Sequence, residues 1–269
     1  MKPIEKLFIY EIKGDVSLPA KSLSKSFLGC WREGGHSYLF FSSFGKEEVL
    51  NFLTRNSEYE YISETEIDYD LWEPADTFRS IEVQPLTVVP AWYGEDKNNK
   101  MQIRIDPGVV FGAGNHHTTR KCLQFLVDLM ADNNISKVLD IGTGTGILAI
   151  AAVKLGASEV LAVDNNNLAV ETAVMNVKLN GLHRSVNCRT GDAVDYTDFN
   201  ADLTLANMNL FVLEKMFNLN RTFGSDWYIV SGLNGAEVGN FQEIIADLPF
   251  EVLRHEMENL WSTLLLRKV

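Results

Sequence analysis

Short apolar runs alternate with segments of helical apolar spacing through much of the chain. The clearest case is the run at residues 138–141, which three glycines spaced by single residues separate from the apolar segment 147–153. Such a run is typical of a buried strand, the glycines end it, and the second segment suits a helix. The pattern therefore predicts a strand, a tight turn and a helix in direct succession.

The same alternation continues beyond this helix and closes with two neighbouring extended runs. Further strands are expected at residues 159–163, 186–189, 202–206, 227–231, 250–257 and 261–266, and helices at 120–130, 168–180, 210–220 and 237–247. Alternating strands and helices require a parallel sheet with right-handed crossovers, and the last two strands form an antiparallel hairpin. Residues 101–269 are therefore predicted to be an α/β, Rossmann-like domain with a seven-stranded sheet.

The first 69 residues have a different pattern. Strands are predicted at 7–12, 30–33, 36–41 and 59–67, with a hairpin around Gly34-Gly35, and helices at 18–28 and 46–55. This β-α-β-β-α-β order predicts a small α+β, ferredoxin-like domain over residues 1–69. The acidic segment 68–78 suggests a linker, so residues 70–100 are expected to hold a linker and a lead-in strand at 81–92, before a strand at 101–105.

Composition narrows the class of protein. The chain has 269 residues, 46% of them hydrophobic, and a net charge of −12, which disfavours direct nucleic-acid binding and favours a basic protein partner. Its three cysteines, Cys30, Cys122 and Cys188, form no C-x-x-C pair, so neither a disulfide framework nor a zinc site is indicated. No signal peptide or membrane helix is expected, and a cytoplasmic location fits best.

The glycine turn is the first candidate for chemistry. Gly142, Thr143 and Gly144 lie where missing side chains let a ligand approach the backbone, in front of a helix amino terminus. Asp164 ends the next predicted strand, about 20 residues later, where a carboxylate can hold the two hydroxyls of a ribose. The alternative role for Asp164 is to cap the helix that follows it.

Two more polar residues end predicted strands of the same sheet. Asp192 follows the strand at 186–189, and Asn207 follows the strand at 202–206. Ligands of such sheets bind beyond the carboxyl ends of the strands, so these residues are expected to converge with Gly142 and Asp164. Asn207 has the alternative role of a turn residue at the end of a strand.

A nucleoside pocket of this kind serves both dinucleotide-dependent dehydrogenases and S-adenosylmethionine-dependent methyltransferases. The turn here reads G-T-G-T-G after Asp140, whereas a pyrophosphate site requires G-x-G-x-x-G. The closing hairpin also breaks the strand–helix alternation. Both features favour a methyltransferase.

These residues resemble the methyltransferases that modify the eleventh protein of the large ribosomal subunit on amino groups of lysine and of the N-terminus. The resemblance extends from Trp72 to about Gly235. It rests on the following segments: residues 85–92 (PLTVVPAW), 106–119 (DPGVVFGAGNHHTT), 138–146 (VLDIGTGTG), 206–207 (AN) and 231–232 (SG).

The resemblance implies a class I methyltransferase fold with S-adenosylmethionine as cofactor. It implies that Thr119, Gly142, Asp164 and Asn207 contact the cofactor, and that the amino-terminal domain recognises a basic, ribosomal protein substrate. With Thr143, Gly144 and Asp192 these residues make up the candidate cofactor site. Asn207 is also the candidate catalytic residue, because its amide could accept hydrogen bonds from the acceptor amine and aim its lone pair.

The chain departs from this family at three places. Ala113 stands where the family usually has threonine, residues 208–211 (MNLF) differ from the usual run after the asparagine, and the amino-terminal domain is short. Two alternatives therefore stay open: a methyltransferase of the same lineage with another protein or a small molecule as substrate, and a non-catalytic cofactor-binding module. His116 and His117 are expected to make capping or solvent contacts, and no metal site is predicted.

Overall fold

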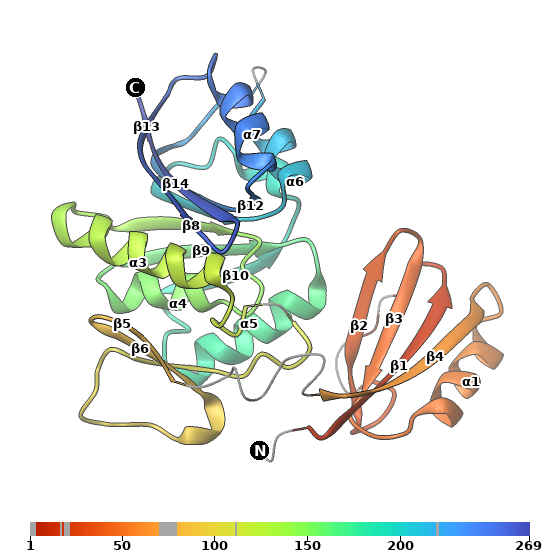
Figure 1. Ribbon diagram of the computed structural model, residues 1–269. Coiled ribbons are helices and arrows are strands. Elements are labelled where there is room, and N and C mark those ends of the chain that lie inside the picture. Colours follow the sequence, from red (N-terminus) through yellow and green to blue (C-terminus); the bar gives the residue numbers. More distant parts are fainter. Residues whose placement is uncertain (1–3, 17, 19–21, 70–79, 111, 219–220) are drawn as a thin grey trace.

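The computed structural model of the chain describes residues 4–16, 18, 22–69, 80–110, 112–218 and 221–269. A seven-stranded sheet with the order β10-β9-β8-β11-β12-β14-β13 forms its larger part (Figure 1). Neighbouring strands from β10 to β12 are parallel, and β14 is antiparallel to both β12 and β13. The predicted sheet and its terminal hairpin are confirmed. The strands are β8 (Lys137–Ile141), β9 (Glu159–Asp164), β10 (Val186–Thr190), β11 (Ala201–Asn207), β12 (Ser225–Asn234), β13 (Phe250–Glu258) and β14 (Trp261–Lys268).

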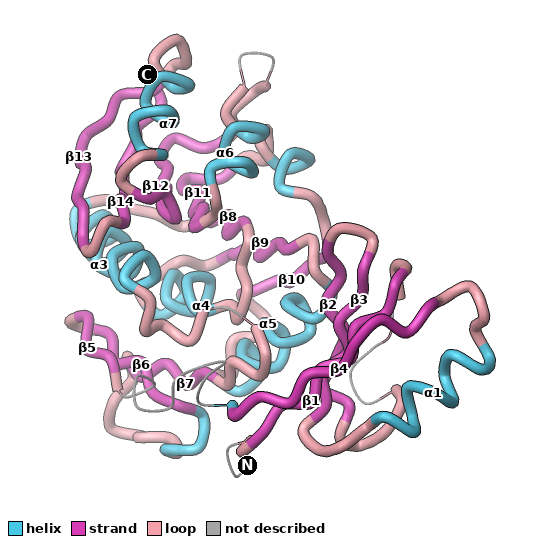
Figure 2. The backbone as a smooth tube through the Cα atoms, turned by 45° about the vertical axis from the view of Figure 1, so that its right-hand side comes forward, coloured by secondary structure: helices cyan, strands magenta, loops and turns pink. Residues whose placement is uncertain are grey.

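Helices cover both faces of this sheet, which explains its buried apolar strands. Figure 2 shows α3, α4 and α5 on one side and α6 and α7 on the other. Two separate apolar clusters fill the spaces between the sheet and these helices. The helices are α3 (His117–Asp132), α4 (Ile147–Lys154), α5 (Asn167–Leu179), α6 (Leu210–Met216) and α7 (Glu237–Ile245), with a short 3-10 turn η2 (Ala193–Tyr196). No helix in the described ranges is both long and apolar enough to cross a membrane.

A three-stranded sheet precedes the large one in the chain. It consists of β5 (Ile81–Val83), β6 (Leu86–Pro90) and β7 (Gln102–Ile105). The 3-10 turn η1 (Ala91–Tyr93) directly follows β6 in the chain. The single strand predicted over 81–92 is therefore wrong, because β5 and β6 form an antiparallel hairpin that turns at Gln84-Pro85. Proline has no N–H for a strand ladder, which favours a turn at this position.

The amino-terminal part is a four-stranded antiparallel sheet with the order β2-β3-β1-β4. Its elements are β1 (Lys6–Lys13), β2 (Phe27–Glu33), β3 (His36–Phe41), α1 (Lys46–Arg55) and β4 (Glu60–Asp68). The hairpin at Gly34-Gly35 and the helix at 46–55 are confirmed. The proposed linker segment lies mostly in residues 70–79, outside the described residues.

The helix predicted over residues 18–28 is wrong where it can be checked. Residues 22–26 form bends and turns, and Phe27 begins β2; residues 19–21 lie outside the described part. The apolar spacing that suggested a helix has another cause. Leu18, Leu23 and Phe27 all pack into the core beneath α1, where a loop and a strand can deliver them without helical geometry.

The other face of the amino-terminal sheet packs against the larger part. Leu7 and Phe40 of this sheet share an apolar cluster with Val109, Val110 and Leu168. The hydroxyl of Tyr69 donates a hydrogen bond to the carbonyl of Gly108 in the same region. The first turn of α5 is therefore covered by the amino-terminal domain.

Candidate functional site

The turn between β8 and α4 has the geometry that its glycines predict. Gly142, Gly144 and Gly146 have φ values of 68°, 54° and 82°, a region that residues with a Cβ rarely enter. The N–H groups of Gly142 and Thr143 donate to the carbonyl of Val163 at 2.8 and 3.0 Å. The turn is thus bonded to the end of β9.

Asp140 holds the same turn from inside. Its Oδ2 accepts hydrogen bonds from the Thr143 hydroxyl at 2.6 Å and from the Ala149 N–H at 3.1 Å. Burial raises the pKa of Asp140 to about 6, while these two hydrogen bonds act in the opposite direction. The Thr143 side chain therefore points at a buried carboxylate. The only sequence signal for this role of Asp140 is its position two residues before the first glycine.

Asp164 occupies the end of β9 beside the turn. Its Oδ2 accepts the Gly144 N–H at 3.0 Å, and its Oδ1 accepts the Asn166 N–H at 2.9 Å. Burial raises the pKa of Asp164, and the two backbone hydrogen bonds lower it. The alternative capping role for Asp164 is wrong, because Asn166 caps α5 by accepting the Leu168 N–H. The Asp164 carboxylate instead links the glycine turn to the segment after β9.

Strand register brings the predicted polar residues together. Ile141 pairs with Val163 on one side and with Ala206 on the other, so Gly142 lies between Asp164 and Asn207 at the carboxyl edge. Asp192 follows β10, in which Thr190 pairs with Asp164. Its Oδ1 accepts the Val194 N–H at 3.2 Å, and its side chain is exposed. Four strand ends thus converge as predicted.

Asn207, at the end of β11, contacts Thr119 of helix α3. Helix α3 begins at His117, earlier than predicted, so Thr119 is in its first turn and is buried. The Nδ2 of Asn207 donates to the Thr119 hydroxyl at 3.5 Å, a long hydrogen bond. Within the described residues its Oδ1 has no hydrogen-bond partner. Asn207 can therefore offer an acceptor to a ligand at the end of β11.

The residue after Asn207 fills part of the expected ligand space. A Cβ placed on Gly142 would lie 1.9 Å from the Sδ of Met208, so the thioether rests directly on the glycine. Periodicity and motif spacing contain no signal for this contact, since it depends on one rotamer. A methionine side chain is flexible, so it can also move away from an arriving ligand.

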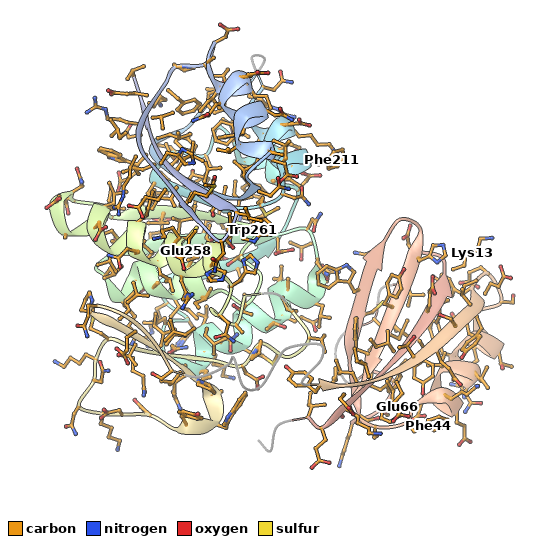
Figure 3. The ribbon with its side chains drawn as sticks, viewed as in Figure 1. Lys13, Phe44, Glu66, Phe211, Glu258 and Trp261 are labelled. Atoms are coloured by element: carbon orange, nitrogen blue, oxygen red, sulfur yellow. The ribbon has the colours of Figure 1, made fainter. Side chains whose placement is uncertain are left out.

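His116 and His117 lie at the start of α3 and make contacts around its first turn. His116 caps the helix, as expected, and its ring packs edge-on against Trp261 at 5.0 Å between centroids. The Nδ1 of His117 lies 2.9 Å from Oε1 of Glu258, which also pairs with Lys121 at 3.3 Å. Figure 3 shows Glu258 and Trp261 beside this end of α3. Among the described residues no group of three or more His, Cys, Asp or Glu could hold a metal.

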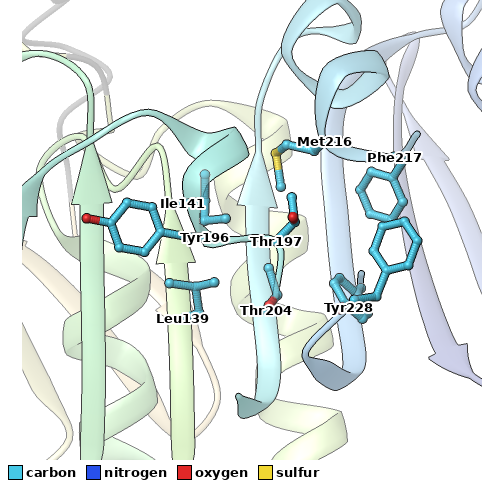
Figure 4. Close-up of a pocket in the computed structure, with 9 residues that line it drawn as sticks. Leu139, Ile141, Tyr196, Thr197, Thr204, Met216, Phe217 and Tyr228 are labelled. Carbon is cyan, nitrogen blue, oxygen red and sulfur yellow. The ribbon is translucent and has the colours of Figure 1, made fainter. Parts of the chain in front are cut away.

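A small cavity between the large sheet and α6 is no candidate for the site. Its volume is about 10 Å³, which scarcely leaves room for one water molecule. Core residues line it (Figure 4): Leu139, Ile141, Tyr196, Thr197, Thr204, Met216, Phe217, Phe223 and Tyr228. It is a packing defect beneath α6.

The strand order and the polar edge define a Rossmann-like α/β protein with the class I methyltransferase fold. Residues 47–269 match the model of the family described as Ribosomal protein L11 methyltransferase (PrmA). The chain belongs to this family.

Individual relatives support this assignment. The Ribosomal protein L11 methyltransferase of Exiguobacterium sp. is 32% identical over 216 residues, which cover 77% of this chain and 68% of that protein. Its counterpart from Halalkalibacterium halodurans is 44% identical over 124 residues, 46% of this chain and 39% of that protein. A crystal structure of ribosomal protein L11 methylase from Lactobacillus delbrueckii subsp. bulgaricus has a TM-score of 0.61 and 27% identity, and covers 72% of this chain and 100% of that one. The chain thus aligns with about two fifths of the length of the Halalkalibacterium relative.

Proposed function

We propose that this chain transfers methyl groups from S-adenosylmethionine to amino groups of the eleventh protein of the large ribosomal subunit. The observation that carries the proposal is the convergence of Asp164, Gly142 and Asn207 on three adjacent strand ends. Family membership supports the reaction type. A net charge of −12 favours a basic acceptor, as ribosomal proteins commonly are. The cytoplasm is then the expected place of action.

The residues at the edge fit this cofactor. Each carboxylate oxygen of Asp164 accepts one backbone N–H and retains capacity for a ribose hydroxyl. Gly142 offers backbone without a side chain, and the Met208 thioether over it is an adaptable apolar neighbour for the methionine half. Asp192 adds an exposed carboxylate two residues beyond the strand next to Asp164. Asp164 and Asp192 would hold the nucleoside half, and the glycine turn the rest.

The bound cofactor supplies a methyl group already activated by a sulfonium. The protein must then position a neutral amine in line with it and exclude water. A lysine amine has a free pKa near 10.4, so neutralising it at pH 7 costs about 4.6 kcal/mol. Burial beside a positive charge lowers an amine pKa by up to about 3 to 5 units, so no separate base is required.

In this proposal Asn207 orients that amine. Its Oδ1 would accept an amine N–H, while its Nδ2 donates to the Thr119 hydroxyl at 3.5 Å. An amide oxygen can accept from a neutral amine without taking its proton. Thr119 would therefore act as a positioning residue, and Asn207 as the catalytic one.

Methyl-labelled S-adenosylmethionine, the purified chain and the purified eleventh ribosomal protein provide the test. Mass spectrometry should find labelled lysine or N-terminal amine groups, and Asn207→Ala should lose most of this activity at saturating cofactor. A lysate with and without ribosomes serves to detect other acceptors. Labelling of a different protein would show that this protein, and not the eleventh ribosomal protein, is the substrate. Cofactor binding without any methylation would favour a non-catalytic module.

A further inference from the structure

A cleft opens where the amino-terminal domain meets the carboxyl edge of the large sheet. It has a volume of about 280 Å³ and is lined by Asp15, Trp31, Arg32, Gly34, Asn165 and Asn166. The first four residues belong to the amino-terminal domain, and the two asparagines directly follow Asp164. The cleft therefore lies beside the carboxylate assigned to the ribose.

Close packing fixes the two walls of the cleft relative to each other. A Cβ on Gly29 of β2 would lie 2.3 Å from Leu168 Cδ1, so only glycine lets this strand approach α5 so closely. Trp31, two residues along β2, packs against the cluster that contains Leu168. Leu168 is in turn bonded through its N–H to Asn166. The hairpin β2–β3 is thus held next to the segment that follows Asp164.

The lining of the cleft suits a flat heteroaromatic ring. Trp31 is half-buried and packs against the apolar cluster that contains Leu168. Arg32 is exposed, and a guanidinium group is planar and can stack on an aromatic ring. The Nδ2 of Asn166 is buried and has no hydrogen-bond partner in the described part of the chain. A buried donor without an acceptor is costly, and a purine ring or a ribose provides acceptors.

We propose that the amino-terminal domain completes the cofactor pocket, with Trp31 and Arg32 forming its outer wall against the nucleoside half. Asn166 Nδ2 donates to the same part of the ligand. This assignment rests on the proposed function, since it takes the cofactor to be an adenosine derivative. The amino-terminal domain then has a second role beside the proposed recognition of the protein substrate.

Calorimetry with two probes on the full chain tests the assignment. S-adenosylhomocysteine contains both halves of the cofactor, and 5′-methylthioadenosine contains mainly the nucleoside half. We expect Arg32→Ala and Trp31→Ala to weaken both probes by the same factor, about five- to tenfold, as for partial loss of stacking on a base. Trp31→Phe should restore most of the affinity. Arg55→Ala is the matched control, because Arg55 ends α1 on the opposite face of the amino-terminal sheet and should leave both affinities unchanged.

Several outcomes would overturn the assignment. Wild-type affinity in Arg32→Ala and Trp31→Ala would remove the hairpin from the pocket, and loss confined to S-adenosylhomocysteine would place the contact at the amino-acid half. Because Arg32 is exposed, its replacement remains informative even if Trp31→Ala does not fold. Normal binding of S-adenosylhomocysteine by both variants would leave the proposed function intact, whereas no binding by the wild-type chain would overturn both.

Discussion

Replacing Asp164 by alanine should lower both the affinity for the cofactor and the free energy of unfolding, and the two losses can be measured separately. The carboxylate accepts the N–H groups of Gly144 and Asn166, and in the proposed complex it also accepts ribose hydroxyls. A hydrogen bond to a charged group is worth about 1.5–3 kcal/mol, so the loss in binding should be of this size, or about 10- to 150-fold in affinity. Leaving the two N–H groups without their acceptor should also lower the free energy of unfolding by about 1–3 kcal/mol.

Isothermal calorimetry with S-adenosylhomocysteine measures the first effect, and urea denaturation measures the second. Asp202→Ala supplies a matched control. The Oδ2 of Asp202 accepts two backbone N–H groups, those of Ser136 and Lys137 at 2.7 and 2.8 Å, but at the amino end of the strands. This variant should lose stability to a similar extent and keep the affinity of the wild type. Unchanged affinity in Asp164→Ala, or an equal loss of affinity in Asp202→Ala, would refute the ribose role.

Three further predictions concern the catalytic amide, the turn and the first helix of the site. Asn207→Ala should lower the single-turnover methylation rate about 10- to 100-fold at saturating cofactor, and an equal rate would exclude Asn207 from the mechanism. Thr143→Val removes the hydroxyl donor of buried Asp140, so urea denaturation should show a loss of about 1–3 kcal/mol, with no change counting against this contact. The pKa of Glu258 is lowered, chiefly by its hydrogen bond with His117. Its stabilisation is therefore present above the unfolded pKa of 4.5 and is lost as the pH falls through the folded value. Glu258→Gln should melt below the wild type at pH 7, and this difference should shrink at pH values below 4.5; a pH-independent difference would contradict the charge argument.

The large sheet could be predicted because its information is local. Four of the five parallel strands, β8, β9, β11 and β12, are largely apolar runs followed by a helix. Right-handed crossovers then leave few possible strand orders. The strand ends follow from the same pattern, which therefore predicts Gly142, Asp164 and Asn207 on one edge of the sheet. Register confirms this neighbourhood.

The features that could not be predicted from the sequence depend on packing between distant segments of the chain. Leu18 and Leu23 suggested a helix, but they reach the core from a loop, because tertiary contacts outweigh local spacing. The contact of Met208 with Gly142 joins residues that follow two different strands, β11 and β8. The cleft at Trp31 likewise requires the docking of one domain on another, which no pattern within either domain encodes.

The position of β14 has a consequence for the order in which the protein forms. This strand lies between β12 and β13, and Glu258 before it reaches back to His117, 141 residues earlier in the chain. During synthesis, Thr119 and the other residues of the edge leave the ribosome long before these anchors exist. The first turn of α3 can therefore form its contact with Glu258 only after residues 250–268 have emerged. A shorter nascent chain would have the complete glycine turn but would lack the strands that hold the start of α3. Maturation of the site therefore depends on β13 and β14, which follow the other five strands of the large sheet in the chain.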